Sequence, residues 1–198
     1  MFALAASACT ASLAGGPFGI DHLVGYDNSG IWRRSNQTAL LDAMIAAEAA
    51  CGIWEGGETR AGRTCWQSID ASLISAVSTE TLKRVFRRER PSDSSSPDQW
   101  FRSGNARSFP SGEASATQSI VTPLLLEYGA DHPWVYALET LPVYDAIARV
   151  KVRAHWQSDV LAGLAIGGAA GWYAHSRERS LVLGVLPHGF TVGLRRSF

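Results

Sequence analysis

Helical periodicity runs through almost the whole of this sequence and limits it to a bundle of helices. Apolar residues recur every three or four positions in five segments. These segments are 36–54, 68–88, 112–128, 133–149 and 157–177. Ser35 and Asn36 are expected to cap the first helix, and Ser68 the second. With 198 residues, the chain is long enough for one hydrophobic core and too short for two. We therefore predict an all-α fold, a single-domain helical bundle over residues 21–198.

The two ends of the chain depart from this pattern. Residues 1–20 carry no charge, but they are built of small residues and lack a basic start, so they make a poor transmembrane helix. Two interpretations stay open for them, the remnant of a signal peptide and a disordered arm. In residues 180–198, two alternating apolar runs flank Pro-His-Gly, which is typical of a small β-hairpin. Residues 160–174 are apolar but short and rich in glycine, which favours a buried helix over a membrane span.

Composition excludes several classes of protein. Apolar residues make up 46% of the chain and charged residues 18%, which is ordinary for a globular protein and excludes wholesale disorder. The formal net charge is zero, so we expect no nucleic-acid partner. No Cys/His cluster has zinc spacing, so we expect no structural metal.

Cys51 and Cys65 bracket a Gly-rich loop that a disulfide would close in an oxidising compartment, and two half-buried thiols are the alternative.

A long polar loop interrupts the helices at residues 89–110, "ERPSDSSSPDQWFRSGNARSFP". A loop of this size in a compact domain is usually functional or disordered. Around the start of this loop, Lys83 and Arg90 are seven residues apart, or two helical turns, with Arg87 between them. We therefore expect these three basic side chains on one helix face. By itself, a basic helix end is typical of a solvated face that complements the helix dipole.

Two further motifs follow this loop. Pro-Ser-Gly at 110–112 leads into an Ala/Ser-rich helix start, whose free N–H groups suit an anion. In "ARVKVRAHWQSDVLAG", His155 and Asp159 are four residues apart, close enough for the carboxylate to hold one imidazole nitrogen. The other nitrogen would then be free as a nucleophile or base. A helix cap made by this pair is the alternative. Arg149 lies six residues upstream and can supply a third cation.

In this order, Lys-x6-Arg-Pro, Pro-Ser-Gly and Arg-x5-His-x3-Asp resemble the motifs of the type 2 phosphatidic acid phosphatase (PAP2) superfamily, which includes acid phosphatases and vanadium haloperoxidases. The resemblance covers residues 83–159 and implies a helical bundle of PAP2 type. It also implies a phosphate cage in which three cations grip phosphate oxygens while a hydroxyl and a backbone N–H assist. The residues at these positions are Lys83, Arg90, Arg149, Ser111 and Gly112.

The resemblance implies a chemistry as well. His155 attacks phosphorus in line and becomes a phosphohistidine, while Asp159 orients its ring. The cations and helix-start amides stabilise the charge on the phosphoryl oxygens, so no metal or other cofactor is required. We expect a metal-independent phosphomonoesterase or diphosphatase that acts on a phosphate-bearing small molecule or lipid. The family's usual extracytoplasmic active site implies the bacterial periplasm or cell envelope, with peripheral contact to a membrane.

The sequence departs from the family at Glu113. The family motif continues Pro-Ser-Gly-His, and that His protonates the leaving oxygen. Three interpretations stay open: Glu113 is the general acid, it repels substrate in a non-catalytic phosphate-binding relative, or it pairs with Arg102, Arg107 or a cage residue at the helix start. The first and third are compatible, and we favour a working phosphatase, whose activity should favour either acidic pH or leaving groups that need little protonation, such as the phosphate of a diphosphate ester. A vanadate-dependent haloperoxidase is less favoured because the sequence offers no acid–base His beside the cage.

Overall fold

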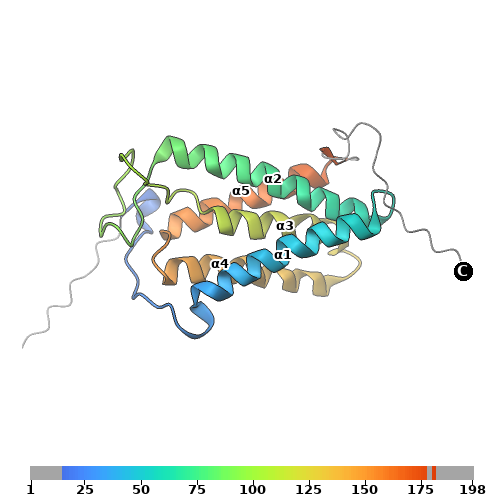
Figure 1. Cartoon of the computed structure of the whole chain (residues 1–198), viewed down its shortest axis with the longest axis horizontal. Coiled ribbons are helices and arrows are strands. Elements are labelled where there is room, and N and C mark those ends of the chain that lie inside the picture. The colour runs from blue at the N-terminus through green and yellow to red at the C-terminus, as the bar shows by residue number, and fades with distance from the viewer. Residues whose placement is uncertain (1–14, 178–179, 182–198) are drawn as a thin grey trace, which may run out of the picture.

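Helices make up most of the chain that the computed structural model describes, residues 15–177 and 180–181. Within these residues, five α-helices lie side by side in a bundle (Figure 1). They are α1 (Arg34–Glu55), α2 (Arg60–Phe86), α3 (Gly112–Tyr128), α4 (Thr140–Lys151) and α5 (Gln157–His175). The predicted all-α bundle is confirmed. The predicted C-terminal hairpin and most of the predicted N-terminal arm lie outside the described residues. Over the described range, none of the helices has the length and apolar character needed to cross a membrane.

Three predicted helix boundaries are wrong. Ser35 and Asn36 lie inside α1 rather than at its cap, and Ser68 lies in the middle of α2. That helix begins earlier because the Thr59 hydroxyl accepts a hydrogen bond from the backbone N–H three residues on, at 2.9 Å. The fourth predicted helix divides into a short 3₁₀ helix, η3 (Pro133–Glu139), followed by α4.

Two glycines of α5 set its distance from α3. A Cβ on Gly163 would lie 2.5 Å from the Ser111 carbonyl oxygen, and one on Gly167 would lie 2.2 Å from the Ser115 carbonyl oxygen. No larger residue fits at either position without moving a helix. The Ser111 N–H also donates to the Asp159 carbonyl at 2.9 Å, which ties the start of α3 to the start of α5. These contacts hold two helix N-termini together at one end of the bundle.

A disulfide joins the C-terminal part of α1 to the N-terminal part of α2, at the opposite end of the bundle. Cys51 and Cys65 form this bond, so the first of the two open interpretations is correct. The crosslink closes a loop with a sequence separation of 14. Closing such a loop restricts the unfolded chain and stabilises a fold by roughly 3 kcal/mol.

The neighbouring glycines Gly167 and Gly168 offer a matched test of this packing. Gly167→Ala should lower the free energy of unfolding by about 1–3 kcal/mol, because the added methyl meets the α3 backbone. Gly168→Ala should leave it unchanged or raise it by up to about 1 kcal/mol, since nothing lies within 4 Å of the added carbon. Urea denaturation followed by circular dichroism measures both. Equal changes in the two variants would contradict this account of the α3–α5 contact.

Candidate active site

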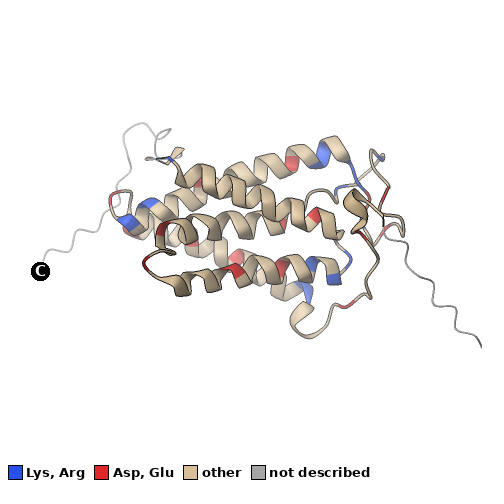
Figure 2. Cartoon of the chain, turned by 180° about the vertical axis from the view of Figure 1, so that it is seen from behind, with Lys and Arg blue, Asp and Glu red and all other residues tan. Residues whose placement is uncertain are grey.

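The three sequence motifs come together at one end of the bundle (Figure 1). The C-terminal ends of α2 and α4 and the N-terminal ends of α3 and α5 meet there, beside the loop that follows α2. Basic residues, blue in Figure 2, occupy the final turns of α2 and α4. Each motif therefore contributes to a single region, although 76 positions separate the first predicted site residue, Lys83, from the last, Asp159.

His155 is buried just before α5, and within residues 15–177 and 180–181 only its Nδ1 makes a hydrogen bond. Its Nδ1 lies 2.7 Å from the Ser108 carbonyl oxygen and 3.8 Å from the Asp159 carboxylate. Because a carbonyl only accepts, Nδ1 carries the proton and Nε2 keeps its lone pair. Burial lowers the pKa of His155 to about 4; Asp159 opposes this shift, and Lys83 and Arg149 add to it. The imidazole is therefore neutral and able to act as a nucleophile above that pH.

Asp159 acts on this imidazole mainly through Ser108. One carboxylate oxygen of Asp159 accepts a hydrogen bond from the Ser108 hydroxyl and another from the Trp156 N–H at 2.9 Å. The other oxygen accepts from Arg88 at 2.6 Å. Burial alone would raise the pKa of Asp159, but the hydrogen bond and charge of His155, the charge of Arg88 and the Ser108 hydroxyl together lower it. The Asp159 carboxylate thus lies within ion-pair distance of the ring, as predicted, while the Ser108 carbonyl makes the shorter contact to Nδ1.

Arg88 is the buried partner that sequence reasoning missed. Its guanidinium lies between two carboxylates, 2.5 Å from Asp21 and 2.6 Å from Asp159, and it also donates to the Pro97 carbonyl. All three charged side chains are fully buried. Asp21 in turn accepts from the backbone N–H and hydroxyl of Ser158, both at 2.7 Å. No sequence signal separates Arg88 from the neighbouring arginines, and Asp21 belongs to no motif.

The prediction that Lys83, Arg87 and Arg90 share one helix face is wrong. α2 ends at Phe86, and Arg87 takes a left-handed backbone conformation with φ 40°, so the chain turns away before Arg90. Arg90 nevertheless lies close enough to Lys83 and Arg149 for its charge to help lower the pKa of both. The three predicted cage cations therefore come together through the loop. Arg90 does not reach this place on a continuation of α2.

Lys83 lies beneath the Pro-Ser-Gly turn. Its ammonium group donates to the carbonyl oxygens of Pro110 and, at 3.2 Å, Arg107. Burial lowers the pKa of Lys83 to about 8, and the charge of Arg90 adds to this effect. Lys83 therefore keeps its charge at neutral pH and also anchors the turn that starts α3.

Ser111 and Gly112 form the beginning of α3. The Ser111 hydroxyl is fully buried and accepts from the Ala114 N–H at 3.4 Å, so it serves as the helix cap. A Cβ on Gly112 would lie 3.6 Å from the Lys83 side chain, which places this backbone beside the cage. The helix start therefore adjoins the cations, as the anion-binding interpretation requires.

A polar cavity of about 290 Å³ opens beside these groups, and we call it the anion pocket. Among the described residues, four arginines line it: Arg34, Arg90, Arg149 and Arg153. Tyr26, Asn28 and Ser92 add polar groups to the wall. A cavity with several guanidinium groups is suited to an oxyanion such as phosphate.

Glu113 lies between two of these arginines. Its carboxylate accepts two hydrogen bonds from Arg34, one of them at 2.7 Å, and approaches Arg149 to 3.5 Å. Burial alone would raise the pKa of Glu113, but the hydrogen bond from Arg34 and the charge of Arg149 together lower it. The carboxylate is therefore ionised at neutral pH and supplies a negative charge between Arg34 and Arg149.

The structure decides between the partners expected for Glu113. A cage residue, Arg149, is close to it, whereas the other two candidates pair elsewhere. Arg102 lies 3.4 Å from Glu89, and Arg107 pairs with Glu80. Arg34, the main partner, is 79 positions upstream at the start of α1, outside every motif. Sequence reasoning had no signal that could find it.

Asp145 is a second carboxyl group near the cage that sequence reasoning missed. It lies one turn before Arg149 on α4 and is fully buried, and neither of its oxygens has a hydrogen-bond partner among the described residues. Burial raises the pKa of Asp145 to about 7, and the charge of Glu113 adds to this effect. Asp145 is therefore neutral at acidic pH and no longer adds negative charge beside Arg149 there, whereas Glu113 still does. In the part of the chain that the structure covers, no group of three or more His, Cys, Asp or Glu is placed to hold a metal ion.

The bundle and its cationic end define a helical protein with a site suited to a phosphate-like anion. The chain belongs to the PAP2 superfamily, whose family model matches residues 66–180 and thus more than half of the sequence. This range contains all three motifs and every predicted site residue.

Two individual proteins resemble parts of this chain. A lipid A 1-phosphatase of Porphyromonas gingivalis is 40% identical over 63 residues, which is 31% of this chain and 14% of that protein. The match therefore spans a small part of the relative's length. The crystal structure of Aquifex aeolicus LpxE matches with a TM-score of 0.51 and 20% identity, over 70% of this chain and 82% of that one. At this identity, the likeness concerns the fold.

Arg88→Met should destabilise the fold strongly because it leaves two buried carboxylates without their cation. We expect the free energy of unfolding to fall by about 3–5 kcal/mol. Arg84→Met, which removes an exposed arginine from the same stretch of chain, should change it by less than about 1 kcal/mol. Chemical denaturation of both variants measures the difference. A small effect at Arg88 would show that the buried pairs are not what holds this end of the bundle together.

Proposed function

We propose that this chain is a metal-independent phosphatase that works through a phosphohistidine intermediate. The observation that carries the proposal is His155, a buried and neutral imidazole whose Nδ1 is held by a carbonyl and whose Nε2 is free. Cationic groups that are suited to phosphoryl oxygens surround it, namely Lys83 and Arg149. A nucleophile beside fixed positive charge is the arrangement that phosphoryl transfer needs.

The reaction proceeds in two steps. In the first, Nε2 of His155 attacks phosphorus, a P–N bond forms, the bond to the leaving oxygen breaks, and that oxygen takes up a proton. The ring gains positive charge, which the Ser108 carbonyl at 2.7 Å and the Asp159 carboxylate at 3.8 Å stabilise. In the second step, water gives up a proton as it attacks phosphorus, the P–N bond breaks, and inorganic phosphate leaves with His155 neutral again.

Glu113 is our candidate for the group that handles these protons. A bound phosphate dianion competes for Arg34 and Arg149, and it raises the pKa of Glu113 by repulsion. The carboxyl group can then deliver a proton to the leaving oxygen and, once ionised, accept one from the attacking water. The same contacts support a second candidate function, a non-catalytic phosphate-binding protein in which Glu113 fills the cage until an anion displaces it.

We further propose a phosphate-bearing lipid as substrate and the bacterial cell envelope as location. The support for the substrate is the local likeness to a lipid A 1-phosphatase. The support for the location is this likeness together with the Cys51–Cys65 disulfide, since such bonds persist mainly in oxidising compartments.

His155→Ala should abolish turnover, because no other group replaces the nucleophile. We expect phosphate release from aryl and lipid phosphates to fall by at least about a thousandfold. His175→Ala, at the far end of α5, should keep wild-type activity. Mass spectrometry of an acid-free quench should detect a phosphoryl group on His155 in the wild type. Undiminished activity in His155→Ala would exclude this mechanism.

The pH profile tests the role of Glu113. His155 must be neutral to attack, so kcat/KM should fall as the pH drops through about 4. Glu113 must be protonated to act as an acid, and because its pKa is lowered below the ordinary carboxyl value, kcat/KM should already fall as the pH rises through the acidic range. The optimum should therefore be acidic. Glu113→His should move the falling limb toward neutral pH, and Glu113→Gln should lose activity on substrates with poor leaving groups. If only Glu113→His is active, the non-catalytic interpretation is correct.

A further inference from the structure

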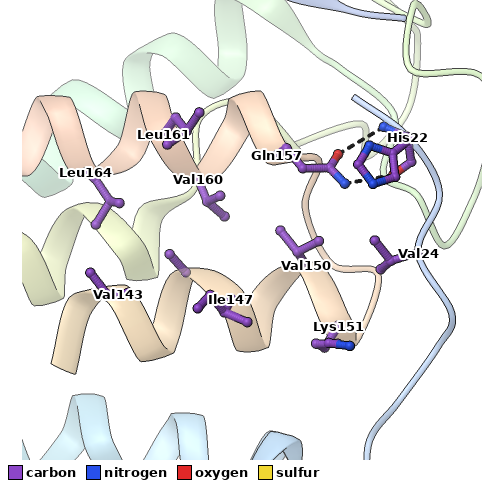
Figure 3. A pocket seen from close by; sticks show the side chains of 11 residues that line it. His22, Val24, Val143, Ile147, Val150, Lys151, Gln157, Val160, Leu161 and Leu164 are labelled. Carbon is purple, nitrogen blue, oxygen red and sulfur yellow. Dashed lines mark hydrogen bonds between the residues drawn. The ribbon is translucent and has the colours of Figure 1, made fainter. Parts of the chain in front are cut away.

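A large apolar groove lies between α4 and α5, outside the site described above (Figure 3). Its volume is about 570 Å³, within the range of cavities that hold small organic ligands. Aliphatic side chains from both helices form its walls. They are Val143, Ile147, Val150, Val160, Leu161 and Leu164.

Part of this aliphatic wall is open to solvent. Val143, Ile147 and Leu161 are 43%, 45% and 54% exposed. Burying the exposed part of such side chains is favourable, and the folded chain leaves that gain unused at three positions around one groove. A contiguous apolar hollow of this kind marks a place where something apolar binds.

The groove and the anion pocket are neighbours that share two stretches of chain. In the segment before α1, His22 and Val24 line the groove, whereas Tyr26 and Asn28 line the anion pocket. Val24 and Tyr26 are two residues apart, a span of at most about 7 Å. At the end of α4, Lys151 lines the groove, and the next residue, Val152, lines the anion pocket.

Hydrogen bonds hold these two stretches against each other. The Arg153 side chain donates to the Val24 carbonyl at 2.9 Å, and the Asp27 N–H donates to the Lys151 carbonyl at 3.0 Å. Both stretches that border the two cavities are therefore fixed relative to each other.

The groove also has a polar end and an apolar end. His22, Lys151 and Gln157 lie together at one end, while Val143 and Leu164 lie at the other (Figure 3). The polar end is the one that adjoins the anion pocket, because His22 and Lys151 belong to the shared stretches. An anion pocket, a polar junction and an aliphatic groove thus follow one another along this face.

We propose that the groove binds the hydrocarbon chain of a lipid phosphate whose phosphate group lies in the anion pocket. This inference rests on the proposed phosphatase function and names the feature of the substrate that the protein recognises. A hydrocarbon chain suits the apolar part of the groove because that part offers no side-chain hydrogen bond. An extended peptide would bring an N–H and a carbonyl per residue that need partners there.

A series of monoalkyl phosphates with two to twelve carbons, used below their micellar concentrations, tests this directly. For the wild type, kcat/KM should rise about three- to fourfold for each methylene that enters the groove, and then level off. Ile147→Asn and Leu161→Gln should flatten this dependence while kcat/KM for p-nitrophenyl phosphate stays within twofold of wild type. Val77→Asn, on an exposed position of α2, is the matched control and should keep the full dependence.

The outcomes separate this inference from the proposed function. If the wild type hydrolyses p-nitrophenyl phosphate but shows no dependence on chain length, the phosphatase stands and the groove inference is wrong. It is also wrong if Val77→Asn flattens the dependence as much as the groove variants do, or if the groove variants only change the oligomeric state in size-exclusion chromatography. If the wild type hydrolyses nothing, the proposed function falls. Calorimetry with dodecyl phosphate and ethyl phosphate then decides. If the wild type binds dodecyl phosphate more tightly than ethyl phosphate, and the groove variants lose this difference, the groove inference is supported. If the wild type binds the two phosphates equally, the inference is wrong.

Discussion

The rest of the structure depends on the buried ion pairs that Arg88 makes with Asp21 and Asp159. All three side chains are fully buried, and removing one partner from such a group costs several kcal/mol. The segment before α1, the loop after α2 and the start of α5 must therefore meet in one arrangement. The same arrangement sets the Ser108 carbonyl against His155, because Asp159 holds the Ser108 hydroxyl. Stability and the orientation of the candidate nucleophile thus have a common physical cause.

The second constraint is the crowding of positive charge at the cage. Like charges held together in a partly buried place repel, and an anion between them relieves that repulsion. Glu113 supplies this anion from within the chain, bound to Arg34 and near Arg149. This explains how a carboxylate is tolerated where the family resemblance leads one to expect histidine. In the function that we propose, a bound phosphate competes with this carboxylate for the two arginines.

Helix α5 shows how one element serves both fold and site. Its glycine face, with Gly163 and Gly167, lies directly on the α3 backbone. Another face presents Val160, Leu161 and Leu164 to the groove beside α4. Membership of the PAP2 superfamily accounts for the bundle and the cationic end.

The sequence by itself determined the helical bundle and the order of the three motifs, because periodicity and spacing depend on residues close together along the chain. It predicted α3 at its true bounds, and it missed the start of α2 because a single hydroxyl cap decided it. Only the tertiary structure decided which charges meet. Arg34 reaches Glu113 across 79 positions, and Arg88 reaches Asp21 across 67. Local pattern cannot determine such pairs, since any of many arginines could neutralise a given carboxylate and packing alone chooses among them.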